Sequence, residues 1–216
     1  MKLNWAELLV VNNPSRVFQQ KLEIGWMKRH AKLPPGGYCL EIGCGRGAGA
    51  AIVESQFSPG FLCAMDLDPS MIRRAFGYLD PGELQNISFC VADAFNLPHA
   101  DGAFDAVFGF GVLHHIPDWQ GALDEIGRVL KPGGIYFLEE LYPSLYQNFI
   151  TRHILLHPTE NRFDGRELRE ALYKADFSVQ AALELKLAGI LAVLKKADVP
   201  SGHPKTMQRR ANHPLF

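Results

Sequence analysis

The feature that most constrains the fold is an apolar strand that runs into a loop with glycine at every second position. It reads Tyr38-Cys-Leu-Glu-Ile-Gly-Cys-Gly-Arg-Gly-Ala-Gly49. Gly43, Gly45 and Gly47, which define the glycine loop, allow the backbone to bend sharply and to approach a ligand without an intervening Cβ. The helix that follows presents unpaired N–H groups to the same place. The segment predicts a strand, a turn and a helix that together bind a ligand.

Glu41, just before the glycine loop, narrows the kind of ligand. A pyrophosphate cradle needs N–H donors and little negative charge, whereas a carboxylate beside the turn suits a ligand with an ammonium or sulfonium group. We interpret the segment as a site for an adenosine-containing cofactor. The glycine loop alone does not separate this interpretation from a dinucleotide site, because dinucleotide-binding folds use similar glycines.

Strand-like and helix-like segments alternate after this loop. The strands are short and apolar at nearly every residue, as expected when helices cover both faces of a sheet. The alternation predicts an α/β fold, a Rossmann-like doubly wound sheet that is mostly parallel. The predicted strands are 38–42, 61–65, 87–92, 104–110 and 134–141, the predicted helices are 48–57, 69–79, 117–130 and 164–176, and 177–185 with 187–195 predict an antiparallel hairpin.

Length, charge and cysteines exclude several classes of protein. The 216 residues are enough for one domain, and a net charge of −1 gives no overall attraction to nucleic acid, so no nucleic-acid partner is expected. The four cysteines show no metal-ligand spacing; we expect free thiols, no metal site and a cytoplasmic protein. No apolar run approaches the roughly 20 residues that cross a bilayer, so no transmembrane segment is expected.

Two aspartates follow neighbouring predicted strands. Asp66 ends the second strand, where its carboxylate can accept hydrogen bonds from both ribose hydroxyls. Asp93 ends the third strand and can accept from an adenine amino group; alternatively, it only ends its strand in a turn. The glycine loop, Asp66 and Asp93 meet at the carboxyl edge of the sheet, where open α/β folds bind ligands.

Together with the segments downstream, the chain closely resembles the class I S-adenosylmethionine-dependent methyltransferases, and most closely the ubiquinone and menaquinone type of their small-molecule branch. The resemblance covers about residues 33–141. It rests on the glycine loop, Asp66, Asp93 and three further motifs: Leu97-Pro-His-Ala-Asp-Gly-Ala-Phe-Asp-Ala-Val107, Val112-Leu-His-His-Ile116 and Arg128-Val-Leu-Lys-Pro-Gly-Gly134. It implies a seven-stranded sheet whose last strand runs antiparallel, inserted between its neighbours.

The resemblance also implies a role for each matching residue. The cofactor would be S-adenosylmethionine and the product S-adenosylhomocysteine. Asp66 would hold the ribose. The methionine part would face Glu41 and the backbone of Gly43, Gly45 and Gly47. The backbone of Phe110 would contact its amino-acid end. The adenine would contact Leu67, Asp93 and the Ala94 N–H.

Methyl transfer from a sulfonium can proceed without a catalytic residue, because alignment and desolvation contribute roughly 7 to 11 kcal/mol. If a general base is used, His114 and His115 are the candidates, since they follow the strand whose end borders the transferable methyl group in this family. The alternative is that they cap or pack against the adjoining helix. Glu139, Glu140, Tyr142 and Tyr146 are candidates for the acceptor side, or the tyrosines pack under a loop.

The segment Pro14 to His30 carries Phe18, Leu22 and Trp26 at four-residue spacing, which predicts a helix with these side chains buried. Alternatively, this helix and Trp5 form a lid over a pocket. We divide the chain into an N-terminal helical cap (1–32), a methyltransferase domain (33–197) and a C-terminal tail (198–216).

The aromatic residues outside the cofactor motifs indicate the acceptor. They predict an apolar small molecule, aromatic or lipid-like, as the recipient of the methyl group; these residues are Trp5, Phe18, Trp26, Tyr142, Tyr146 and Phe149. Gly109-Phe-Gly111 stands where methyltransferases of nucleic-acid and protein nitrogens carry Asn-Pro-Pro-aromatic. The alternative function is a non-catalytic S-adenosylmethionine-binding regulator or complex subunit. The sequence leaves the oligomeric state open.

Overall fold

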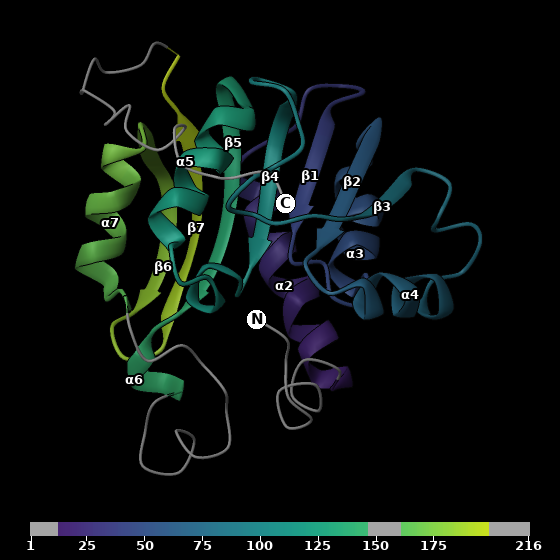
Figure 1. Cartoon of the computed structure of the whole chain (residues 1–216), viewed down its shortest axis with the longest axis horizontal. Coiled ribbons are helices and arrows are strands. Elements are labelled where there is room, and N and C mark those ends of the chain that lie inside the picture. Colours follow the sequence, from purple (N-terminus) through teal and green to yellow (C-terminus); the bar gives the residue numbers. More distant parts are fainter. Residues whose placement is uncertain (1–12, 147–160, 199–216) are drawn as a thin grey trace, which may run out of the picture.

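The computed structural model describes residues 13–146 and 161–198. Their strands form one seven-stranded sheet in the order β3-β2-β1-β4-β5-β7-β6 (Figure 1). Neighbouring strands run parallel except β7, which is antiparallel to β5 and to β6. The strands are β1 (Tyr38–Ile42), β2 (Phe61–Asp66), β3 (Ile87–Val91), β4 (Phe104–Phe110), β5 (Leu130–Leu141), β6 (Phe177–Leu185) and β7 (Gly189–Lys196).

Helices cover both faces of this sheet (Figure 1). Buried side chains of α2, α3 and α4 pack on one face, and those of α5 and α7 pack on the other. The helices are α2 (Pro14–His30), α3 (Ala48–Phe57), α4 (Pro69–Tyr78), η1 (Leu113–His115, a 3₁₀ turn), α5 (Trp119–Val129), α6 (Pro143–Tyr146) and α7 (Gly165–Lys174). The predicted fold class is confirmed, and so is the antiparallel last strand inserted between its neighbours.

One predicted boundary differs by several residues. The sequence predicts a helix to Leu130 and a strand from Gly134, but the helix ends at Val129 and β5 begins directly after it. The pairing of β4 with β5 jumps from Phe104–Leu130 to Ala106–Ile135, so residues 131–134 bulge out of the ladder. Proline at 132 has no N–H to give to the ladder, and Gly133 has φ = 72°, a conformation that favours glycine.

The predicted buried face of the N-terminal helix is wrong. Phe18 and Leu22 are 65% and 61% exposed, and Trp26 is half-buried. The side chains that α2 buries are Gln20, Ile24 and Met27. Both sets repeat at helical spacing, so periodicity alone does not tell which stripe faces inward; packing against α3 and the sheet decides it. Trp5, Phe149 and residues 199–216 lie outside the described residues.

The sheet has a topological switch point between β1 and β4. The chain leaves β1 toward β2 and β3 and then returns to pair β4 with the other side of β1. Ile42 at the end of β1 is in register with Met65 of β2 and Gly109 of β4. Loops that leave β1 and β4 therefore diverge, and open α/β folds bind ligands in the crevice at the carboxyl edge of such a switch point.

The cysteines agree with the expectation of free thiols. All four cysteines are free, and Cys39, Cys44 and Cys63 are buried in or beside strands of the sheet. Within residues 13–146 and 161–198, no helix combines the length and the apolar character that crossing a bilayer requires.

Asp68→Ala should destabilise the fold through α4. The Asp68 carboxylate accepts a hydrogen bond from the Ser70 N–H (2.9 Å) and caps the helix. Loss of such a cap costs about 1 kcal/mol, which lowers the melting temperature of a chain of this size by about 2–4 °C. Thermal unfolding followed by circular dichroism tests this. Asp80→Ala is the control, because Asp80 is exposed; an equal loss in both variants would contradict the capping role.

Candidate active site

The three glycines of the glycine loop have different surroundings. All have positive φ, at 69° (Gly43), 54° (Gly45) and 85° (Gly47). A Cβ on Gly43 would lie 2.6 Å from Val112 after β4, and one on Gly47 would lie 3.0 Å from Leu79 beyond α4. A Cβ on Gly45 would meet no atom within 4 Å. The outer glycines thus let the loop pack against its flanks, while Gly45 faces open space on which a ligand can lie.

Glu41 is a buried carboxyl group beneath this loop. It is 2% exposed, and its Oε2 atom has no hydrogen-bond partner in the described part of the chain. Burial, and secondarily the negative charge of Asp66, raises the pKa of Glu41 to about 8. A Cβ on Gly49 would lie 2.2 Å from Glu41 Oε1, so the first turn of α3 can cover this carboxylate only with glycine at that position. Within residues 13–146 and 161–198, Glu41 Oε2 is therefore a buried acceptor without a partner.

Asp66, at the end of β2, holds the glycine loop from the side. Its Oδ2 accepts from the Gly45 N–H (2.9 Å) and its Oδ1 accepts from the Asp68 N–H (2.8 Å). Burial raises the pKa of Asp66 above its usual value although these N–H groups oppose the shift. A carboxylate has about four acceptor positions, so two remain for other donors. Asp68 caps α4 as described above, and the two aspartates have separate roles.

The residues implied for the adenine surround the ends of β2 and β3. Leu67 is 52% exposed, and Ala94 is buried. The Ala92 N–H donates to the Asp66 carbonyl (3.2 Å) and makes the last contact between β3 and β2. Asp93 is the next residue after this contact. The exposed Asp93 accepts from the Phe95 N–H (3.0 Å) through Oδ1, which is the turn role named as its alternative. Its Oδ2 makes no hydrogen bond among the described residues.

Phe110 ends β4 on the other side of the crevice. It is half-buried, and its ring lies 6.1 Å from that of Phe108. The side chain thus packs against the core on the α2 face of the sheet. The contact of the Phe110 backbone with the amino-acid end of a cofactor stays a prediction.

His114 forms a buried pair with Glu140. His114 Nδ1 lies 2.7 Å from Glu140 Oε2, and the side chains are 4% and 0% exposed. Glu140 Oε1 accepts from the N–H groups of Val112 (2.8 Å) and Leu113 (2.6 Å). Because a carboxylate only accepts, Nδ1 carries the imidazole proton and Nε2 is the basic nitrogen. The His115 ring is half-buried and lies 4.2 Å from the His114 ring.

Glu139, one residue earlier on β5, holds a different segment. Its carboxylate forms an ion pair with Arg16 of α2, and the same guanidinium donates to Glu23 Oε2 (2.8 Å). Burial raises the pKa of Glu139 to about 7 although the Arg16 charge opposes the shift. Neighbouring side chains of a strand point to opposite faces, so Glu139 binds the N-terminal helix while Glu140 binds η1.

Tyr142 takes the packing role rather than the acceptor role. It is 2% exposed, and its hydroxyl donates to Glu184 Oε1 of β6 (2.7 Å). Sequence reasoning named Glu139 and Glu140 only as acceptor-side residues, and it missed Arg16 and Gln20. Arg16 is 123 positions from Glu139, so only the folded chain brings the two together.

The polar groups at this edge fit S-adenosylmethionine. An unpartnered buried carboxylate, an open glycine and an aspartate with spare acceptor positions match an ammonium and two ribose hydroxyls. Residues 40–138 match the family described as "Methyltransferase domain", a range that runs from β1 into β5 and contains the glycine loop, Asp66 and His114. Over this range the chain is similar to methyltransferase domains.

Curated relatives match about half of the chain. The chain is 38% identical over 113 residues to a demethylmenaquinone methyltransferase of Staphylococcus epidermidis (51% of this chain, 46% of the relative). It is 33% identical over 104 residues to a probable phthiotriol/phenolphthiotriol dimycocerosates methyltransferase of Mycobacterium ulcerans (48% and 39%). It is 30% identical over 125 residues to a sterol 24-C-methyltransferase of Gibberella zeae (57% and 33%). The chain spans about a third to a half of the length of these relatives.

Solved structures share the fold of the methyltransferase domain over most of the chain. A putative sarcosine dimethylglycine methyltransferase from Galdieria sulphuraria is 15% identical with a TM-score of 0.72, covering 84% of this chain and 86% of that one. An S-adenosylmethionine-dependent methyltransferase from Aquifex aeolicus is 18% identical with a TM-score of 0.70, covering 90% and 99%. At these identities the likeness establishes the fold alone.

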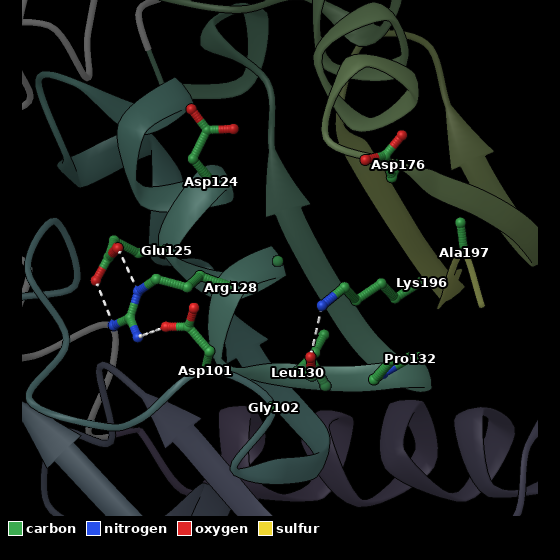
Figure 2. Close-up of a pocket in the computed structure, with 11 residues that line it drawn as sticks. Asp101, Gly102, Asp124, Glu125, Arg128, Leu130, Pro132, Asp176, Lys196 and Ala197 are labelled. Atoms are coloured by element: carbon green, nitrogen blue, oxygen red, sulfur yellow. Dashed lines mark hydrogen bonds and ion pairs between the residues drawn. The ribbon is translucent and has the colours of Figure 1, made fainter. Parts of the chain in front are cut away.

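A cavity of about 590 Å³ lies at the opposite edge of the methyltransferase domain (Figure 2). It is lined by residues before β4, at the start of β5 and at the end of β7, all at the amino edge of the parallel strands. Arg128 is bound by Glu125 and Asp101, and Lys196 donates to the Leu130 carbonyl. These contacts hold the segments around the cavity in place. The cavity lies away from the carboxyl edge, where the glycine loop and Asp66 are found.

Glu41→Gln should change how the stability of the methyltransferase domain depends on pH. The ordinary glutamate pKa is about 4.5 and that of Glu41 is about 8, so between these values the folded state holds a proton that the unfolded state has lost. Wild-type stability therefore falls as pH rises through this window, and the loss is complete above about pH 8. The variant lacks this titration.

Thermal unfolding between pH 5 and pH 9 measures the effect. The melting temperature of Glu41→Gln minus that of wild type should rise up to about pH 8 and then level. Glu170→Gln, on the exposed side of α7, is the control. A difference for Glu41→Gln that stays constant across this range would show that Glu41 is ionised throughout.

Proposed function

We propose that this protein transfers a methyl group from S-adenosylmethionine to an apolar small-molecule acceptor. The observation that carries the proposal is the carboxyl edge of β1 and β2. There the buried Glu41 lacks a partner, Gly45 faces open space and Asp66 retains acceptor positions. A cationic amino acid joined to a nucleoside satisfies all three groups, and a pyrophosphate satisfies none of the carboxylates.

Each residue of the edge has a share in holding the cofactor. Glu41 would neutralise the ammonium group, and Asp66 would accept from the ribose hydroxyls while it keeps Gly45 in place. The exposed Leu67 would give the adenine an apolar face, and Asp93 with the Ala94 N–H would bind its edge. The cofactor supplies an electrophilic methyl group, which an in-line nucleophile displaces. What remains for the protein is to align the acceptor, exclude water and remove a proton where one must leave.

The acceptor is proposed from the named relatives and from the aromatic content of the chain. The relatives are named for a quinone precursor, a sterol and a mycobacterial dimycocerosate, all large and apolar. We extend this class to the present chain.

The proposed division is a helical cap (1–32), the methyltransferase domain (33–197) and a tail (198–216). The free cysteines support a cytoplasmic location.

His114 is the better of the two candidates for a general base. Glu140 holds its ring through Nδ1, so Nε2 is the nitrogen that would accept a proton. Because η1 follows β4 and the Val112 side chain packs on Gly43, this dyad lies beside the glycine loop. Its burial means that an acceptor must enter the crevice to reach it.

Asp66→Ala should weaken cofactor binding by about 1 to 3 kcal/mol, the range for losing hydrogen bonds to a charged group. Isothermal calorimetry with S-adenosylhomocysteine and its 2′-deoxy analogue measures this. The loss should be smaller for the analogue, which lacks one of the hydroxyls that Asp66 would bind. Asp80→Ala serves as the exposed control. Unchanged affinity in folded Asp66→Ala protein would overturn the ribose assignment.

His114→Ala should lower kcat by about 100- to 10,000-fold and leave the affinity for S-adenosylhomocysteine within about twofold. The acceptor comes from a turnover screen of sterols and quinone precursors. Glu140→Gln should lower kcat and shift the acidic limb of the pH profile, which a purely structural role would not do. Normal rates in both His114→Ala and His115→Ala would remove the general-base proposal.

Two simple outcomes would replace the proposed function. Binding of nicotinamide dinucleotides but not of S-adenosylmethionine would indicate a dehydrogenase. Binding of S-adenosylmethionine without turnover of any acceptor in the screen would favour the alternative, a regulator or complex subunit that only binds the cofactor.

A further inference from the structure

Gln20 is the exceptional residue on the buried face of α2. The other side chains that this helix buries, Ile24 and Met27, are apolar and fully buried in the core. Gln20 is 8% exposed, and no hydrogen bond joins its carboxamide to any residue within 13–146 and 161–198. The carboxamide is not among the fully buried polar atoms without a partner, so it keeps a small contact with solvent and is open to a ligand.

The carboxamide lies over the first turn of α3, next to Glu41. A Cβ on Gly49 would be 2.9 Å from Gln20 Nε2 and 2.2 Å from Glu41 Oε1, so both atoms gather above the same glycine. Glu41 Oε2 is also buried and without a partner. An amide donor and a carboxylate acceptor thus lie side by side, at the N-terminal end of a helix, and they are not bonded to each other.

This pair is complementary to the zwitterion of an α-amino acid. The Glu41 carboxylate suits the ammonium group, while the Gln20 N–H and the positive end of the α3 dipole suit the α-carboxylate. The helix position of Gln20 is also fixed. Arg16 lies one turn earlier on the same side of α2, and its ion pair with Glu139 holds that end of the helix on β5.

We propose that Gln20 binds the α-carboxylate of the cofactor's methionine moiety, so that the N-terminal helix forms part of the cofactor site. The assignment rests on the proposed function and adds a residue outside the matched range 40–138. The helical cap then binds the amino-acid end directly, and Gln20 distinguishes ligands that carry this end from those that lack it.

Two ligands and four proteins test the assignment by calorimetry. S-adenosylhomocysteine has the amino-acid end, and 5′-methylthioadenosine is the same adenosine thioether without it. The proteins are wild type, Gln20→Met, which keeps the length but removes the amide, Gln20→Glu, which sets a carboxylate against the ligand carboxylate, and Gln19→Met, an exposed control whose amide donates to Glu23.

Gln20→Met should weaken S-adenosylhomocysteine binding by about 10- to 100-fold, the range for a hydrogen bond to a charged group. Gln20→Glu should weaken it further. Binding of 5′-methylthioadenosine should change by less than about twofold in both, which also shows that the variants are folded. Gln19→Met should bind both ligands as wild type does.

Two results would overturn the assignment, and they are distinguishable. If wild type binds both ligands and Gln20→Met loses the same factor for each, or for neither, then Gln20 does not contact the carboxylate and the proposed function stands. If wild type binds neither ligand, the proposed function fails and the assignment fails with it.

Discussion

The site depends on the alternation of side chains along β5. This strand is paired on both sides, with β4 and with β7, and its last residues reach the carboxyl edge. Glu139 points to one face and holds α2 through Arg16; Glu140 points to the other and holds η1 through His114 and two backbone N–H groups. Two adjacent carboxylates on β5 thus position α2 on one face of the sheet and η1 on the other.

Local signals in the sequence predicted the framework well. The glycine loop, the strand that precedes it and the helix predicted from residue 164 are short patterns whose structure depends on neighbours in the chain, and the structure reproduces them. The inward face of α2 could not be predicted in the same way. Phe18 and Leu22 have the right spacing, but Arg16 and Gln20 are placed by partners on β5 and at the end of β1. Charged pairs between distant residues leave no periodic trace in the sequence.

The matched range explains why the cofactor is easier to identify than the acceptor. Residues 40–138 contain the glycine loop, Asp66, Asp93 and the histidines, whereas α2, Glu140 and the hairpin of β6 and β7 lie outside it. The shared part of the fold carries the chemistry common to the family. The parts around it hold the groups, such as Arg16 and Glu139, that shape the remainder of the crevice in this chain.

The two hydrogen bonds of Asp66 have a consequence for the thermodynamics of binding. Because the N–H groups of Gly45 and Asp68 donate to this carboxylate, contacts within the protein hold the glycine loop in its bent shape. The conformational entropy of ordering the glycines is then lost during folding and not during association. A flexible glycine-rich segment thereby acts as a rigid, preorganised surface, and a small cofactor can be bound tightly without a large contact area.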